Sequence, residues 1–157
     1  MTESVQVLKV DFKESCYDQP IVDLINHYMS DPMGCNYIQT NEMKQNLIDG
    51  LRNHPTVVIL LAKINETFVG LMIGFENFGT FAAKKFINIH DILVRKEFRN
   101  RNIGRLMLKF MENYARETNC SKITLEVRHD NENAKHLYNS EGYVDDTPPM
   151  YFWTKKL

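Results

Sequence analysis

The sequence predicts a single domain of mixed α and β structure, and three observations support this. The chain has 157 residues, a length at which one hydrophobic core is enough. Segments rich in β-branched residues alternate along it with helical apolar patterns. No repeat, low-complexity tract or Pro/Gly/Ser-rich linker divides the chain, so we expect residues 1–157 to form one domain.

The N-terminal part of the chain is expected to form one strand and two helices. A short strand is predicted over 5–10, and apolar residues at helical spacing after Pro20 predict the first helix. Thr40 or Asn41 can cap the second helix, which should end near Asn53 because Pro55 cannot continue it.

The clearest element is a long amphipathic helix that begins near Ile103. Its apolar residues fall at offsets 0, 3, 4, 7, 8 and 11 from Ile103, and the pattern stops at Thr118. A hairpin of two central strands is expected upstream, since 56–64 and 68–75 are rich in β-branched residues and leucine. The other expected elements are strands over 86–94, 123–127 and 150–154 and a short helix over 131–140.

Composition and charge disfavour several classes of function. The formal net charge is -1 at pH 7, which provides no basic field for a polyanion, so we expect no nucleic-acid partner. The three cysteines lack the spacing of a disulfide framework or a thiolate metal site, and the longest apolar run, 56–62, is too short to cross a bilayer. We therefore expect a soluble cytoplasmic protein with no membrane partner and no metal.

The strongest functional signal lies in the connector between the strand 86–94 and the long helix. A loop that leads into a helix forms an anion site, because the N–H groups of the first helical turn are unpaired. Gly104 strengthens this interpretation, since a glycine in the first turn of a strong helix indicates that a ligand approaches the backbone. The alternative is that the basic residues here only solvate the connector. These residues are Arg95, Lys96, Arg99, Arg101 and Arg105.

Two stretches, VRKEFRNRNIGRLML and ITLEVRHDNENAKHLYNSEGY, resemble the cofactor-binding signature of the GNAT-type N-acetyltransferases over about 68–143. The resemblance implies a strongly twisted mixed sheet of about six or seven strands, flanked by about four helices, with acetyl-CoA as cosubstrate. Asn102 replaces the first glycine of the family motif, and asparagine tolerates left-handed backbone angles better than most residues. The implied pyrophosphate loop consists of Arg99, Asn100, Arg101, Asn102, Ile103 and Gly104, followed by Arg105.

The second stretch matches the family's N-x-x-A-x-x-L-Y-x-x-x-G-[FY] run from Asn131 to Tyr143. The resemblance implies that Asn131 hydrogen-bonds the pantetheine arm and that Tyr138 protonates the departing thiolate. A general acid beside the leaving group contributes on the order of 10² to 10⁴ in rate. The alternative is that Leu137 and Tyr138 only pack a short helix.

The strand FINIHDILV is expected to supply the other side of the site. Strand alternation places His90, Ile92 and Val94 on one face and Ile89, Asp91 and Leu93 on the other. The resemblance implies that Ile92, Leu93 and Val94 lend backbone groups to the pantetheine and the acetyl carbonyl. An amine nucleophile must lose a proton, which His90 can accept near neutral pH, while Asp91 can attract the cation or orient a water. The alternative is a purely structural His–Asp pair.

The implied reaction is direct transfer of the acetyl group of acetyl-CoA to the amine of a small-molecule acceptor, without a cysteine intermediate. The alternatives are a non-catalytic acyl-CoA sensor and a peptide or aminoglycoside N-acetyltransferase. The chain also distantly resembles the diamine acetyltransferases, in which an acidic residue serves as base at the position of His90. A dinucleotide-binding protein is disfavoured, since no early G-x-G-x-x-G occurs.

Acceptor specificity and assembly are expected to depend on loops and on the C-terminal segment. The acceptor candidates are Asp31, Tyr37, Glu76, Phe78 and Phe81, although the aromatic residues can instead cover the core or contact a second copy, and the carboxylates can simply be solvated. An expected C-terminal strand with Tyr151, Phe152 and Trp153 would offer a pairing edge for a homodimer.

Overall fold

The computed structural model describes residues 4–32 and 34–157, and the chain divides into one compact unit that ends at Glu126 and a second that runs from Val127 to Leu157. The strands are β1 (Val5–Lys9), β2 (Val57–Ile64), β3 (Thr67–Gly79), β4 (Lys84–Val94) and β5 (Ile123–Leu125). The helices are α1 (Asp18–Met29), α2 (Asn41–Asn53), α3 (Ile103–Glu117) and α4 (Glu132–Ser140), with 3₁₀ turns at Ser15–Tyr17 and Lys96–Phe98. None of these helices is long and apolar enough to cross a membrane.

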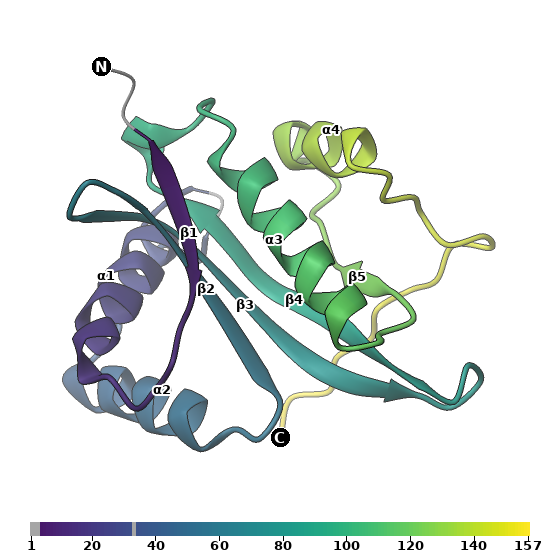
Figure 1. Ribbon diagram of the computed structural model, residues 1–157, viewed down its shortest axis with the longest axis horizontal. Helices are drawn as coiled ribbons and strands as arrows, with labels where there is room; N and C mark the ends of the chain where they lie inside the picture. Colours follow the sequence, from purple (N-terminus) through teal and green to yellow (C-terminus); the bar gives the residue numbers. More distant parts are fainter. Residues whose placement is uncertain (1–3, 33) are drawn as a thin grey trace. The chain divides into compact units, whose positions relative to one another are not determined.

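One sheet carries the strands of the first unit in the order β1-β2-β3-β4-β5 (Figure 1). Neighbouring strands are antiparallel except for β4 and β5, which are parallel. The predicted mixed α/β class is therefore confirmed. The described chain forms a five-stranded sheet, fewer than the expected six or seven.

The final strand predicted over 150–154 is wrong, because this stretch has no strand geometry and its aromatic side chains are exposed. Strand formation needs a neighbouring edge to pair with as well as residues of high β-propensity, and only the second condition can be recognised in a sequence. The strand predicted over 123–127 is shorter than expected and ends at Leu125.

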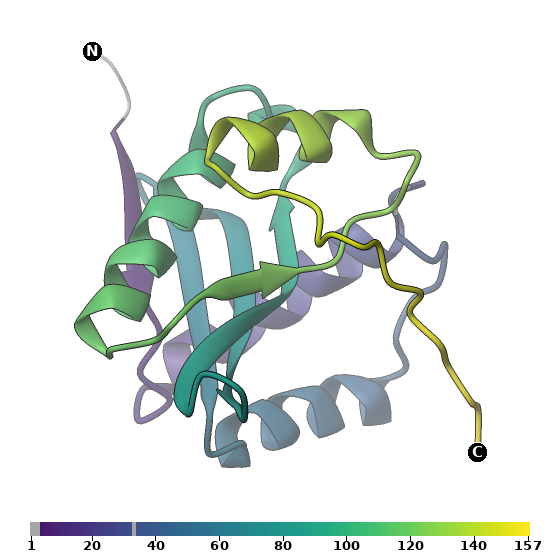
Figure 2. The ribbon, with the colours of Figure 1, turned by 90° about the vertical axis from the view of Figure 1, so that its right-hand side faces the viewer.

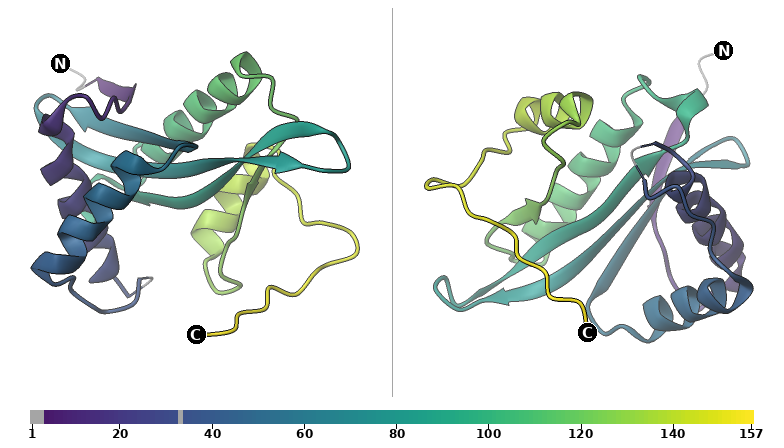
Figure 3. Two further views of the ribbon diagram at one scale, coloured as in Figure 1. Left: turned by 90° about the horizontal axis from the view of Figure 1, so that it is seen from below. Right: turned by 180° about the vertical axis from the view of Figure 1, so that it is seen from behind.

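The sheet has a helical layer on each face, which Figures 2 and 3 show from three directions. Helices α1 and α2 cover one face, where their apolar residues form a core with Ile59, Leu71 and Leu93 of the sheet. Helix α3 covers the other face. Buried residues of β2 alternate between the two layers, as expected for a central strand. We call these two sides of the sheet the α1–α2 face and the α3 face.

Two glycines of β3 let α3 lie close to the sheet. A Cβ atom at Gly70 would meet the Met107 Cε at 3.1 Å and the Ile103 Cγ2 at 3.3 Å. A Cβ atom at Gly74 would meet the Met111 Cε at 3.3 Å. Because the first residue of α3 packs on Gly70, the height of the helix start above the sheet depends on this glycine.

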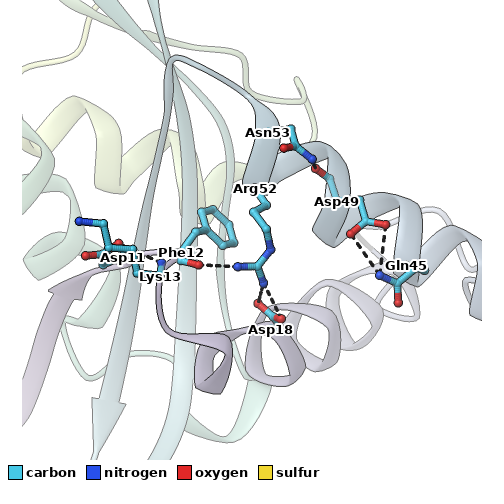
Figure 4. A network of polar contacts seen from close by, with 8 residues as sticks. All are labelled: Asp11, Phe12, Lys13, Asp18, Gln45, Asp49, Arg52 and Asn53. Atoms are coloured by element: carbon cyan, nitrogen blue, oxygen red, sulfur yellow. Dashed lines mark hydrogen bonds and ion pairs between the residues drawn. The ribbon is translucent and has the colours of Figure 1, made fainter.

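Polar contacts fix the ends of α2 on the opposite face. Thr40 caps the helix as predicted, since its Oγ1 accepts a hydrogen bond from the Met43 N–H at 3.2 Å. At the other end, the Arg52 guanidinium donates to the Phe12 carbonyl and to both carboxylate oxygens of Asp18 at 2.7 Å (Figure 4). The C-terminal end of α2 is thereby tied to the start of α1.

Candidate active site

The connector between β4 and α3 forms the turn that the motif predicted. Asn100 has φ of 64° and Asn102 has φ of 60°, so both lie in the left-handed region. Asn102 is also the N-cap residue of α3. Asparagine is one of the few residues that adopts this conformation readily, which explains why the turn forms without the family's first glycine.

The start of α3 presents backbone N–H groups beyond this turn. The first hydrogen bond of the helix runs from the Leu106 N–H to the Asn102 carbonyl at 3.0 Å, so the Ile103 and Gly104 amides precede the helical ladder. The Asn102 side chain makes no capping hydrogen bond to them. Together with the positive end of the helix dipole, these amides can bind an anion such as a pyrophosphate.

Basic side chains of the connector are held in different ways. The Arg101 guanidinium lies 5.2 Å from the centre of the Phe98 ring. Arg99 Nε donates to the Val94 carbonyl at 3.1 Å, and its Nη2 lies 2.9 Å from the Asp31 carboxylate. A predicted cofactor residue and a predicted acceptor residue are therefore paired with each other.

Strand β4 contains a bulge at His90. In its register with β3, Ile89 pairs with Gly74 and Asp91 pairs with Ile73, so His90 has no opposite residue. Ile89 thus shares the α3 face with Gly74, whereas Asp91 shares the α1–α2 face with Ile73.

The predicted separation of His90 and Asp91 onto opposite faces is wrong. The His90 ring packs 6.0 Å from the ring of Phe75, which lies against the core of the α1–α2 face, and Asp91 is on that face as well. A simple alternation of period two cannot account for one extra residue, and the bulge supplies it. The structure thereby brings His90 and Asp91 to the same side.

The two side chains of this pair differ in burial, which affects the carboxyl of Asp91. Burial raises the pKa of the Asp91 carboxyl above its usual range, and the neighbouring His90 opposes this shift. His90 is exposed, while Asp91 is partly buried. A carboxylate with a raised pKa is a better proton acceptor, so the pair is suited to take a proton from an amine.

A row of polar side chains that the sequence analysis missed continues this face. Asn88 Nδ2 donates to Thr124 Oγ1 at 3.2 Å and approaches Glu126 Oε1 at 3.4 Å. Asn88 pairs with Phe75 in the sheet and therefore shares the face of His90. The sequence feature that could have indicated Asn88 is its position, since it is a polar residue two places before His90 in a largely apolar strand.

Glu76 lies on the α3 face, where its carboxylate has two polar partners. Its carboxylate pairs with Lys85 at 3.0 Å and accepts a hydrogen bond from the Tyr114 hydroxyl at 3.1 Å. Burial, together with the charge of Glu76, raises the pKa of Tyr114 to about 12. Glu76 is thus on the side of the sheet opposite to His90 and Asp91.

The other acceptor candidates are exposed. Phe78 lies near the end of β3, opposite Lys85, and Phe81 lies in the turn that leads to β4. The Tyr37 hydroxyl contacts the Met43 sulfur at 3.6 Å.

The second motif lies in the second unit, where its residues have local roles. Asn131 Oδ1 accepts a hydrogen bond from the Ala134 N–H at 3.2 Å and so caps α4. The Tyr138 ring packs 6.0 Å from the Tyr143 ring, and the Tyr143 N–H donates to the Tyr138 carbonyl at 3.0 Å. Gly142 has φ of 86°, which ends the helix in the left-handed conformation that glycine favours.

A mixed sheet with a bulged strand, followed by a helix start whose amides can bind a pyrophosphate, fits the class of proteins that bind a phosphate-bearing coenzyme. The chain belongs to the acetyltransferase (GNAT) family, whose model matches residues 21–143. It is therefore an acyltransferase.

Known relatives agree with this family. The chain is 31% identical over 102 residues to the uncharacterized N-acetyltransferase YhfO of Bacillus subtilis (strain 168), which covers 65% of this chain and 68% of YhfO. The crystal structure of a probable acetyltransferase superposes with a TM-score of 0.82 at 19% identity over 97% of both chains. The structure of AAC(6')-Iy with the bisubstrate analogue CoA-S-monomethyl-acetylneamine superposes with a TM-score of 0.78 at 9% identity, over 98% of this chain and 99% of that one. These two likenesses concern the fold.

Proposed function

We propose that this chain transfers the acetyl group of acetyl-CoA to the amine of a small-molecule acceptor. The observation that carries the proposal is the left-handed turn at Asn102, which presents the free amides at the start of α3 directly after the bulged strand β4. A pyrophosphate needs several N–H donors and positive charge at one place, and this turn has both.

The proposed cosubstrate site is built mainly from backbone groups. The amides of Ile103 and Gly104 bind the pyrophosphate, and the turn residues Asn100 and Asn102 shape the loop around it. The neighbouring side chains of Arg101 and Arg105 supply positive charge. The backbone of Ile92, Leu93 and Val94 faces the pantetheine arm and the thioester, and Asn131 lends its side chain to the same arm.

The proposed reaction is a direct attack that needs no enzyme-bound acyl group. The unprotonated acceptor nitrogen attacks the acetyl carbonyl carbon, the C–N bond forms and the C–S bond breaks. A backbone amide near Leu93 stabilises the developing oxyanion. The amine proton passes to the His90–Asp91 pair, directly or through a water, and Tyr138 protonates the departing sulfur.

The acceptor class is proposed from the charges around the bulge. The carboxylates of Asp91 and Glu126 are on the α1–α2 face, so a cationic amine would be attracted there. Tyr37, Phe78 and Phe81 remain candidates for the outer wall of the acceptor site, whereas the carboxylate of Asp31 is paired with Arg99 and that of Glu76 lies on the other side of the sheet. Peptides and aminoglycosides are the alternative acceptors, and a sensor that binds acetyl-CoA without turnover is the alternative function.

We also propose that residues 1–157 act as one acetyltransferase domain, since the family match over residues 21–143 extends across both compact units. A homodimer is supported by the exposed apolar C-terminal segment, in which Tyr151, Phe152 and Trp153 are each more than four-fifths exposed. The three cysteines are all free thiols, which supports a reducing cytoplasm.

The function is tested by thermal unfolding with and without acetyl-CoA, followed by thiol release with polyamines, amino acids, aminoglycosides and short peptides. We expect an upward shift of Tm that depends on acetyl-CoA concentration, and thiol release with one class of amine. A Gly104→Val variant, which places a side chain at the helix start, should lose the shift. A shift without turnover would favour the sensor, and the absence of any shift would refute the proposed function.

A further inference from the structure

The ion pair between Arg99 and Asp31 joins two segments that are far apart in the chain. Arg99 directly precedes the left-handed turn at Asn100 and Asn102, which we call the cofactor turn, and Asp31 follows the C-terminal end of α1. A second contact lies beside it, since the Lys96 N–H approaches Nε2 of His27 in the last turn of α1 at 3.4 Å. The end of α1 thus contacts the connector between β4 and α3 at two points, both just before the cofactor turn.

The two partners of this pair differ in their exposure to water. The Asp31 side chain is only 9% exposed, whereas that of Arg99 is 40% exposed. A carboxylate removed from water is stabilised only if a positive charge and hydrogen bonds replace its hydration, and removing its partner is costly. The carboxylate of Asp31 is therefore stabilised as long as the guanidinium of Arg99 remains beside it.

The guanidinium of Arg99 also makes a hydrogen bond to the main chain of β4. Its Nε donates to the carbonyl of Val94, the last residue of β4, while Nη2 contacts Asp31. The planar guanidinium fork bridges the end of the strand and the end of α1, a geometry that a lysine cannot reproduce. The residues that follow Arg99 form the left-handed turn, so the bridge fixes where that turn begins.

We propose that Asp31 is a positioning residue for the cofactor turn. Its carboxylate holds Arg99 against Val94 both before and after acetyl-CoA binds, and the pyrophosphate is bound by the backbone amides and by the other arginines. Asp31 accordingly does not bind the acceptor amine, although it follows the helix from which acceptor residues were expected. This inference rests on the proposed function, because it presumes that the turn binds acetyl-CoA.

A competing role for Asp31 would change the Kd of acetyl-CoA in the opposite direction. If Asp31 only competed with the pyrophosphate for Arg99, removing its charge would release the guanidinium and tighten acetyl-CoA binding. If Asp31 positions Arg99, the same substitution weakens binding. The sign of the change in Kd therefore separates the two arrangements.

The chain offers a matched control for the substitution Asp31→Asn. Asp18 forms the same type of pair with Arg52 at 2.7 Å, in the network at the end of α2 (Figure 4). Isothermal titration of the full chain with acetyl-CoA should give a Kd about tenfold higher for Asp31→Asn, the size expected for one coupled pair, and an unchanged Kd for Asp18→Asn. Steady-state kinetics should show the same substitution raising the KM for acetyl-CoA by a larger factor than it lowers kcat, because the bridge acts on coenzyme binding.

Two further variants complete the test. Arg99→Lys keeps the charge but loses the fork, and we expect it to weaken binding as Asp31→Asn does, which also provides the test if Asp31→Asn does not fold. In the double variant the two losses should not add, because both remove the same bridge. An unchanged or lower Kd for Asp31→Asn, or additive losses, would overturn the inference while leaving the proposed function intact. Failure of the wild-type chain to bind acetyl-CoA would instead refute the proposed function.

Discussion

Single residues determine the local geometry of the candidate site through their backbone conformation and burial. Asn102 takes the left-handed conformation, with φ of 60°, at the position where the motif has glycine. Asp91 shares the α1–α2 face with His90 only because one extra residue shifts the register of β4. Both residues could be singled out from the sequence, Asn102 by the motif and Asp91 by its place in the strand FINIHDILV. The shift of register could not be predicted, because an uninterrupted alternation can be drawn through the same strand.

The loss of the phenolic hydroxyl at position 138 tests the proposed general acid. We expect Tyr138→Phe to lower kcat by roughly ten- to a thousandfold, because a proton donor acts mainly on the transition state. The Kd of acetyl-CoA should change little. Steady-state kinetics and titration of the same preparation measure both quantities, and an unchanged kcat would remove Tyr138 from the mechanism.

The burial of Asp91 predicts a stability that depends on pH. Its pKa is raised in the folded state, so the free energy of unfolding falls as the pH rises from the unfolded pKa to the folded pKa, and the loss is complete above the folded pKa. The variant Asp91→Asn should therefore have a higher Tm than wild type at pH 7. The gain should disappear as the pH falls below the ordinary carboxyl value of about 3.9.

Thermal unfolding between pH 3 and pH 8 measures this difference, with Asp146→Asn as the control for loss of a carboxylate at an exposed position. The same Asp91→Asn variant should be slower at saturating substrate if Asp91 assists proton removal. A Tm below that of wild type at pH 7 would contradict the pKa shift.

Secondary structure elements were the most predictable level of this molecule. The periodic helix α3, the capped helix α2 and the β2–β3 hairpin all lie where the patterns placed them, because each is specified by local residues. The close approach of α3 to the sheet was not predictable. It depends on Gly70 and Gly74 facing the methionines of a helix that is remote in sequence.

Adding a methyl group at Gly70 tests this close packing. Gly70→Ala should destabilise the fold by about 1–3 kcal/mol, because the new Cβ would lie 3.1 Å from the Met107 side chain. Gly50→Ala is the matched control, since a Cβ there meets nothing within 4 Å in helix α2 and should stabilise by about 0.5–1 kcal/mol. Chemical denaturation measures both, and a neutral Gly70→Ala would mean that α3 has room to shift.

At the scale of the whole molecule, the family and the fold class were predictable, and the C-terminal segment was not. The motif pair specifies the family because it combines two spaced signatures, one in each compact unit. The segment after Tyr143 carries residues of high β-propensity and forms no strand in the described chain. Whether such a segment forms a strand depends on a partner edge, which no local pattern contains.

The exposed C-terminal aromatic residues test the proposed homodimer. Replacing Tyr151 and Trp153 with serine should convert the dimer to a monomer, because apolar side chains with this exposure supply the area that a second copy would bury. Analytical ultracentrifugation of wild type and variant measures the mass. A wild-type monomer would exclude the dimer, and an unchanged dimer would move the interface elsewhere.

The use of main-chain groups at the start of α3 has an evolutionary consequence. Every residue except proline carries the same backbone N–H group. A site in which such groups bind the ligand therefore tolerates the exchange of most side chains around it, provided that the turn keeps its left-handed positions. Asn102 shows that a residue other than glycine can supply such a left-handed position. If the start of α3 binds the coenzyme as proposed, substitutions elsewhere in the chain can change the acceptor preference while the coenzyme site is kept, which makes the scaffold a good starting point for selecting new acceptor preferences in the laboratory.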